Sequence, residues 1–176
     1  MLAQPVFLMK IILYIYCPNC NNMRAQKFSD INRIEKIIGK CDVCNIGVVD
    51  SDNKPYVFTM NFGYKDRCIY LHSAQHGKKT GILKKNPFAF AVFSTDHELY
   101  IQSEDVACSY GMKYKSVHAS GKVEFIDSET EKTEALRIIM SHYSEKVFTY
   151  NTPAVKNVKV YRIVIEEITG KEFGHL

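Results

Sequence analysis

The sequence predicts a mainly β (α+β) fold, in which a small antiparallel β-barrel carries helices on its periphery. Runs rich in β-branched and aromatic residues recur along the chain, and turn-forming residues separate most of these runs by short distances. Between them lie three segments whose apolar residues have helical spacing. Strands joined by close turns pair antiparallel, so six or more such strands with three intervening helices point to a barrel.

The composition is that of a globular chain with one domain. Hydrophobic residues make up 46% of the 176 residues and charged residues 24%, which is enough apolar material for a full core. The formal net charge of +4 could attract a phosphate-bearing small molecule but is thin for a nucleic-acid binder. No run approaches the ~18 apolar residues of a membrane helix. We therefore expect a cytoplasmic protein with no nucleic-acid or membrane partner.

The first 22 residues differ from the rest of the chain. Their apolar run, Val6–Tyr16, is interrupted by Lys10 and lacks the small-residue cleavage site of an export signal. Met23 begins an ordinary polar entry into the first helix. We expect residues 1–22 to be a leader or extension and residues 23–176 to form the domain.

The first predicted elements are a helix and a three-stranded meander. The helix covers Asp30–Ile38, where isoleucines recur at helical spacing and Asp30 is placed as the N-cap. The strands, separated by polar turns, are Val43–Val49, Tyr56–Phe62 and Cys68–Leu71.

The middle of the chain contains a basic helix and further strands. A short helix that begins at Gly77 is stopped by Asn86 and the proline after it, and a buried strand follows at Phe88–Ser94. A long strand pair is predicted across Val106–Phe125, with a bend at Gly121.

The last predicted elements are one helix and one strand. Ser128 and Glu131 resemble a capping box, so a helix is expected from there to about Ser144. The strand Val158–Ile168 closes the chain, because its apolar and β-branched residues form an uninterrupted run.

Two Cys-x-x-Cys pairs allow two interpretations. Cys17 and Cys20 are separated from Cys41 and Cys44 by twenty residues, near the upper end of the spacing of a four-thiolate zinc site. However, the intervening segment has helical spacing, and the second pair lies at the entry to an apolar strand, where buried cysteines are ordinary core residues. We expect reduced thiols and no metal, with zinc at these four cysteines as the alternative.

The segment that says most about function runs from Ile69 to Gly81, where an apolar strand leads through polar residues into a basic helix start. Lys78 and Lys79 supply positive charge, while Gly77 and Thr80 leave backbone N–H groups free at the helix N-terminus, where the macrodipole favours anions. This arrangement fits a phosphate. The alternative is a solvated basic helix start, because most charge runs have no other role.

Several segments share their order and spacing with a known family: Pro55–Tyr64, Ile69–Ala74 followed by Gly77-Lys-Lys, Lys113–Val117, Ser120–Glu124, Met140–Tyr143 and Ile165–Lys171. They resemble the nitroimidazole-resistance family within the pyridoxamine-phosphate-oxidase-like FMN-binding split-barrel superfamily. The resemblance spans Met23 to about Phe173, so residues 1–22 lie outside it.

The resemblance implies a six-stranded antiparallel FMN-binding split β-barrel with peripheral helices, and a homodimer with FMN in a cleft between the subunits. One departure is Lys78, where the oxidases carry an arginine, so the charge is kept but the bidentate fork is lost. The segment that grips the vitamin phosphate in true oxidases is not recognisable, and pyridoxamine phosphate is not expected as the substrate. The positions that match the family's flavin contacts are Phe58, Thr59, Met60, Asn61, His72, Ser73, Lys78, Lys79 and Ser116.

The resemblance also implies reductive detoxification, in which reduced FMN delivers electrons in pairs to the nitro group of a nitroimidazole drug. His72 is the candidate catalytic residue, because an imidazole with an ordinary pKa of about 6.5 can donate a proton near neutral pH. A lone histidine can instead be structural. The competing functions are a zinc-stabilised interaction module and a non-catalytic flavin- or haem-binding protein, with potential haem ligands at His97, His118 and His142.

Overall fold

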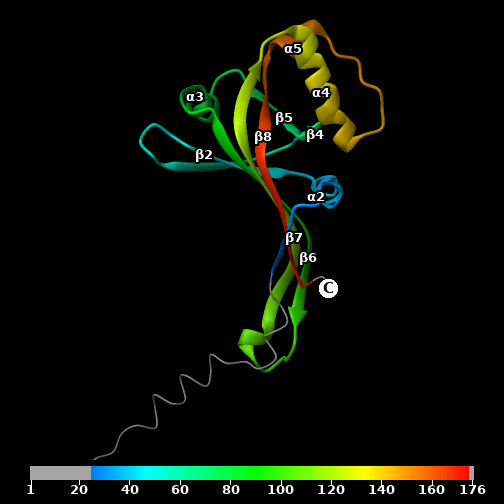
Figure 1. Ribbon diagram of the computed structural model, residues 1–176. Coiled ribbons are helices and arrows are strands. Elements are labelled where there is room, and N and C mark those ends of the chain that lie inside the picture. The colour runs from blue at the N-terminus through cyan, green and yellow to red at the C-terminus, as the bar shows by residue number, and fades with distance from the viewer. Residues whose placement is uncertain (1–24, 175–176) are drawn as a thin grey trace, which may run out of the picture.

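The computed structural model describes residues 25–174, whose strands form one eight-stranded antiparallel sheet (Figure 1). Residues 1–22, which were predicted to be a leader or extension and contain Cys17 and Cys20, lie outside the described residues. The strands are β1 (Gln26–Phe28), β2 (Cys44–Val49), β3 (Pro55–Met60), β4 (Gly63–Lys65), β5 (Cys68–Ala74), β6 (Phe88–Ile101), β7 (Tyr110–Ile126) and β8 (Val158–Phe173). Their order along the sheet is β3-β2-β6-β7-β8-β5-β4, and β1 pairs with β8 beside this path.

The sheet is not closed, because β3 and β4 are its two ends and do not pair with each other. This open sheet confirms the predicted split barrel. Six strands have six residues or more, as predicted, whereas β1 and β4 have only three each. Tyr64 and Lys65 of β4 were predicted to belong to the polar turn between two strands. The turn itself is tighter than predicted, because Asp66 and Arg67 both adopt left-handed backbone between β4 and β5.

The prediction for β6 and β7 was wrong in its pairing. Residues 106–125 do not contain a strand pair; β7 is a single strand that pairs with β6, which continues to Ile101. The polar residues after Ser94 led to the prediction that the strand ends there. In the structure a bulge between Thr95 and Glu98 absorbs them, and pairing then resumes. Figure 1 shows β6 and β7 projecting beyond the barrel as a long ribbon.

Gly121 forms the bend that the sequence predicted. The register between β7 and β8 shifts between Ser120 and Gly121, which marks a bulge. A Cβ atom at Gly121 would lie 1.9 Å from the carbonyl oxygen of Val164, so no other residue fits without displacement of the backbone.

The helices are α2 (Ile31–Ile38), α3 (Lys78–Lys85), α4 (Glu129–Tyr143) and α5 (Thr152–Lys156), with a short 3₁₀ turn, η2 (Ala107–Ser109), between β6 and β7. Asp30 caps α2 as predicted, and its carboxylate accepts a hydrogen bond of 2.7 Å from the Arg33 backbone N–H. Ser128 is the N-cap of α4, but its side chain makes no capping bond. The sequence did not predict α5, a single turn capped by Asn151.

The buried side chains form two clusters on opposite faces of the sheet. The larger cluster fills the barrel and includes Phe62, Phe93 and Ile163, and α2 packs three isoleucines against it. The smaller cluster contains Ile126 and Val160 and lies under α4. Within residues 25–174, no helix combines the length and apolar character needed to cross a membrane.

Candidate functional site

The candidate site begins at the N-terminus of α3, where two lysines lie against β3. The Lys78 ammonium lies 4.5 Å from the centroid of the Tyr56 ring, and the Lys79 ammonium lies 5.2 Å from that of Phe58. Lys79 Nζ also donates to the Met60 sulfur at 3.1 Å. The structure therefore brings two of the predicted flavin contacts, Phe58 and Met60, together with the predicted phosphate segment.

This helix start carries positive charge that no ion pair within residues 25–174 neutralises. The charge of Lys78 does reach Asp50, whose pKa is lowered first by the hydrogen bond from the Lys54 backbone and also by this lysine. Gly77 is the N-cap, so no side chain caps the first N–H groups, and the first turn contains no acidic residue. Among residues 25–174, neither Lys78 nor Lys79 forms an ion pair. A thioether and aromatic faces attract an ammonium only weakly compared with an anion. The arrangement is suited to bind a phosphate group.

The floor of the site is formed by Tyr161, which the sequence did not predict, and by Ser73, which it did. The hydroxyl of Tyr161 on β8 lies 3.9 Å from the Met60 sulfur, and burial raises the pKa of Tyr161 to about 12. Ser73 lies near it and donates to the backbone carbonyl of Ala74 at 3.1 Å. Tyr161 is opposite Leu71 in the sheet register. Tyr161 can be assigned to the site only from the pairing of β5 with β8, because no local sequence motif marks this residue.

His72 lies on the other face of β5 from Ser73. It is opposite Val160, which belongs to the cluster under α4, and Nδ1 of its ring is buried without a hydrogen-bond partner. Burial lowers the pKa of His72 below its ordinary value, and the charge of Lys79 lowers it further. The imidazole is therefore neutral at pH 7, which differs from the unperturbed group assumed from the sequence.

The structure does not bring three other predicted residues into this group. Thr59 is exposed on the outer face of β3 and donates to the side-chain carbonyl of Asn45 at 2.8 Å, and Asn61 is exposed just after the strand. Ser116 lies on β7 between Ser94 of β6 and Lys171 of β8, on the face opposite the barrel core. Thr59 and Ser116 lie on the outer face of the sheet, on the other side from Phe58 and Met60.

Unpartnered buried polar atoms provide a test of whether a cofactor fits. Within the described part of the chain, four side-chain atoms are buried without hydrogen bonds: Nδ1 of His72 and the hydroxyls of Thr80, Ser116 and Tyr150. Buried polar groups are normally paired, so each such atom requires an explanation. Two of the four belong to β5 and α3, and α3 also carries the two lysines without ion pairs. A bound molecule with a phosphate and further polar atoms fits these residues.

The second cysteine pair lies in the core. The Cys41 thiol donates to the backbone carbonyl of Ile37, the Cys44 thiol donates to that of Met60, and burial raises their pKa values to about 11 and about 12. Both thiols are therefore protonated. Residues 25–174 contain no cluster of three or more metal-ligating side chains, and the other pair, Cys17 and Cys20, falls outside that range.

The histidines that could bind haem have other contacts. Nε2 of His142 lies 2.7 Å from the Cys41 carbonyl oxygen, and its ring packs on Phe62. His97 is hydrogen-bonded to the Ser94 hydroxyl at 2.7 Å. His118 packs edge-on against an aromatic ring of β6. These contacts hold the three rings in place without a metal.

Comparison with solved structures finds a protein with substantial sequence identity. A proposed 5-nitroimidazole antibiotic resistance protein from Bacteroides thetaiotaomicron VPI-5482 is 42% identical, with 86% of this chain and 89% of that chain covered and a TM-score of 0.77. The flavocytochrome Anf3 from Azotobacter vinelandii is 19% identical over 83% and 68% of the two chains, with a TM-score of 0.71. The FAD and heme binding protein from Mycobacterium smegmatis is 14% identical over 84% and 73%, with a TM-score of 0.74. The last two similarities show a shared fold.

A search of curated proteins finds no match. The family model described as pyridoxamine 5'-phosphate oxidase matches residues 30–172, which include the whole candidate site. Together with the 42% identity to the Bacteroides protein, this match shows that the chain belongs to the pyridoxamine 5'-phosphate oxidase family and has its split-barrel fold.

Proposed function

We propose that the chain binds FMN at the N-terminus of α3 and uses it to reduce the nitro group of nitroimidazole-type compounds. The observation that carries the proposal is the uncapped helix start with Lys78 and Lys79, two cations without ion pairs among the described residues, in a chain 42% identical to a protein named for 5-nitroimidazole resistance. Other proteins with this fold are named as FAD-binding or as flavocytochromes, which supports a flavin.

The phosphate of FMN would be held by the N-terminus of α3. The free backbone N–H groups of the first turn donate to phosphate oxygens, and the Lys78 and Lys79 ammonium groups add charge-assisted hydrogen bonds. Lys79 is already held between Met60 and Phe58, so little side-chain freedom is lost when it binds. The buried Thr80 hydroxyl, one residue further along α3, is an additional donor.

The ring of the cofactor would lie beside β3 and β5, where Phe58, Met60 and Ser73 line the site with Tyr161 behind them. Bound flavin in its reduced form supplies the electrons for nitro reduction. His72, close enough to Lys79 for that charge to add to the effect of burial on its pKa, would contribute a neutral imidazole whose N–H donates a hydrogen bond to a nitro oxygen. The low pKa suits this role, because a permanently charged ring would repel Lys79.

A homodimer would complete the site, because Thr59, Asn61 and Ser116 lie away from α3 in one chain. The outer face of the sheet that carries Thr59 and Ser116 also exposes large apolar side chains. Val57 is 65% exposed and Phe90 44%, and Leu99 and Met112, opposite one another on the projecting ribbon, are 58% and 46% exposed. Apolar area of this kind is typical of a surface that another protein covers. A second copy on this face would place its Ser116 hydroxyl at the flavin.

The test is a titration of the flavin-free protein with FMN, followed by anaerobic stopped-flow oxidation of the reduced complex by a nitroimidazole. The proposal expects FMN uptake and reoxidation faster than that of free reduced FMN at the same nitroimidazole concentration. Absence of binding at high micromolar flavin would refute the cofactor assignment. Binding with reoxidation no faster than that of free FMN would refute the reductase and leave a flavin-binding protein.

A further inference from the structure

A second group of cations lies between α2 and β7, on the face of β7 opposite that of Ser116. Arg33 and Lys36 lie one turn apart on α2, and Lys40 lies one further turn on, just after the helix. Lys113 and Lys115 alternate along β7, so they point to the same face, the one that α2 covers. These five side chains line a pocket of about 490 Å³.

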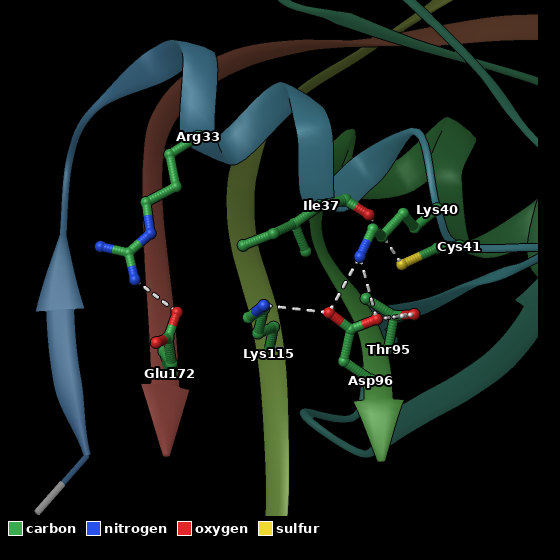
Figure 2. Close-up of polar contacts among 8 residues, drawn as sticks. All are labelled: Arg33, Ile37, Lys40, Cys41, Thr95, Asp96, Lys115 and Glu172. Carbon is green, nitrogen blue, oxygen red and sulfur yellow. Dashed lines mark hydrogen bonds and ion pairs between the residues drawn. The ribbon is translucent and has the colours of Figure 1, made fainter. Parts of the chain in front are cut away.

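Carboxylates hold most of these cations in position. Asp96 lies 3.1 Å from the ammonium groups of both Lys40 and Lys115, as Figure 2 shows, and these bonds, first that of Lys115, lower the pKa of Asp96. Glu172, which is 7% exposed, pairs with Arg33 (Figure 2). Three of the five cations are therefore held by these two carboxylates, and of these three Lys40 and Arg33 keep side chains that are 57% and 44% exposed.

Lys113 has a similar anchor. Its ammonium group lies 3.0 Å from Glu98, and only 24% of its side chain is exposed. Lys115 is covered to a similar extent, with 26% of its side chain exposed. A lysine side chain on a solvent-exposed surface usually has a larger exposed fraction than these two lysines have.

The pocket keeps an excess of positive charge. Five cations face three carboxylates, so two positive charges remain. Lys36 forms no ion pair with any residue in the 25–174 range. This excess is present in a concave region, where the field of several cations adds.

Backbone strain accompanies the arrangement. Asp96 has a φ of 54°, in the left-handed region that non-glycine residues rarely occupy, and it lies in the bulge of β6 between Thr95 and Glu98. The bulge directs the Asp96 carboxylate toward Lys40 and Lys115 (Figure 2). Strained positions of this kind cluster at binding sites, where they orient the groups that bind.

We propose that this pocket binds a small molecule that carries a phosphate or pyrophosphate group, at a site separate from that of the flavin. Lys36 and Lys113 would make the new contacts, since Lys36 has no ion pair in the described chain and the Glu98 partner of Lys113 is exposed. The volume matches that of pockets for molecules of nucleotide size. No residue of the pocket belongs to β3 or α3, so the inference does not depend on FMN binding.

The experiment is isothermal titration calorimetry of the flavin-free full chain with inorganic pyrophosphate, ADP and adenosine at low ionic strength. Wild type is expected to bind pyrophosphate and ADP, but not adenosine, and affinity should fall as salt is added. Lys36→Gln with Lys113→Gln should weaken binding by at least about tenfold, because each lost charged hydrogen bond is worth ~1.4 kcal/mol or more.

Three control variants locate the binding. Lys36→Arg with Lys113→Arg keeps the charge and should bind like wild type, and Lys65→Gln, at an exposed ion pair on β4, should have no effect. Lys78→Ala with Lys79→Ala should retain ADP binding, which separates this pocket from the flavin site. Loss of ADP binding in that last variant, or wild-type affinity in the folded Lys36/Lys113 glutamine variant, would overturn the inference.

Discussion

The Lys79 ammonium lies 3.1 Å from the sulfur of Met60, so a half-buried cation is paired with a thioether and not with a carboxylate. A thioether is a weak acceptor and leaves most of the positive charge available. The contact joins α3 to β3 and holds the lysine in place before any ligand arrives. This relationship explains why a helix start with two lysines and no counter-charge can be stable as well as suited to a phosphate.

Lys78→Ala combined with Lys79→Ala should weaken FMN binding. Charged hydrogen bonds to phosphate are worth about 1.5 to 3 kcal/mol each, so the dissociation constant should rise by at least about tenfold for each lysine. Riboflavin lacks the phosphate and should bind both proteins alike. Fluorescence titration measures both flavins. The matched control is Lys84→Ala with Lys85→Ala at the other end of α3, which removes the same charge and should leave FMN affinity unchanged.

His72→Ala should slow nitro reduction and leave FMN affinity largely intact. Loss of a hydrogen-bond donor to an oxygen that gains negative charge slows turnover by about 10² to 10³. Because burial lowers the pKa of His72, the wild-type rate should stay level above pH 7 and change only as the pH falls through that lowered pKa. Stopped-flow reoxidation by a nitroimidazole across this pH range is the measurement. Equal rates for the two proteins would assign His72 a structural role.

The sequence predicted what local chemistry determines and missed what depends on distant pairing. The phosphate segment at Lys78 could be found because its charges and the helix start are adjacent in the chain. Tyr161 and Ser116 could not be placed, since their neighbours follow from the order of strands in the sheet. The bulge at Asp96 could not be predicted either, because polar residues in a bulge inside a strand look the same in the sequence as polar residues that end a strand.

Asp96→Asn should lower the free energy of unfolding at pH 7 by about 1 kcal/mol or less, since its ion pairs are partly solvated. The bonds to Lys115 and Lys40 lower the pKa of Asp96, so their contribution is present above the ordinary carboxyl pKa of about 3.9 and is lost as the pH falls through the lowered value. Urea unfolding between about pH 7 and pH 2.5 should therefore show the two proteins converging.

The control for Asp96 is Asp66→Asn. Asp66 also has left-handed backbone, with a φ of 50°, but forms no ion pair within the described residues, so its substitution should change stability little at any pH. Asparagine tolerates this backbone as aspartate does. A stability difference for Asp96→Asn that stayed constant with pH would mean that packing or strain, and not charge, causes the effect.

Gly121→Ala should destabilise the protein. The added Cβ would lie 1.9 Å from the Val164 carbonyl oxygen, so β7 and β8 must move apart at the bulge. Overpacking of this kind lowers the free energy of unfolding by about 1 to 3 kcal/mol. Gly81→Ala, within α3 and with open space around the new methyl group, should instead be neutral or stabilising. Urea unfolding of the flavin-free proteins compares them, and equal stability of the Gly121 variant and wild type would show that the bulge adapts.

The proposed homodimer predicts that carboxylates on the projecting ribbon will separate the subunits. Leu99 and Met112 are opposite one another on β6 and β7, and both are exposed in the single chain, so Leu99→Asp with Met112→Asp should not disturb the barrel core. In a dimer these substitutions would bury two unpaired carboxylates per subunit, and the free-energy cost of removing them from water would favour dissociation. We therefore expect a monomer. Sedimentation velocity measures the mass, and circular dichroism checks the fold. Val147→Asp, at a side chain that is 98% exposed away from the ribbon, should leave the mass unchanged.

A monomeric double variant should also bind FMN more weakly, because the partner's outer face would no longer cover the flavin. A wild-type protein that is monomeric yet binds FMN tightly would refute the shared site.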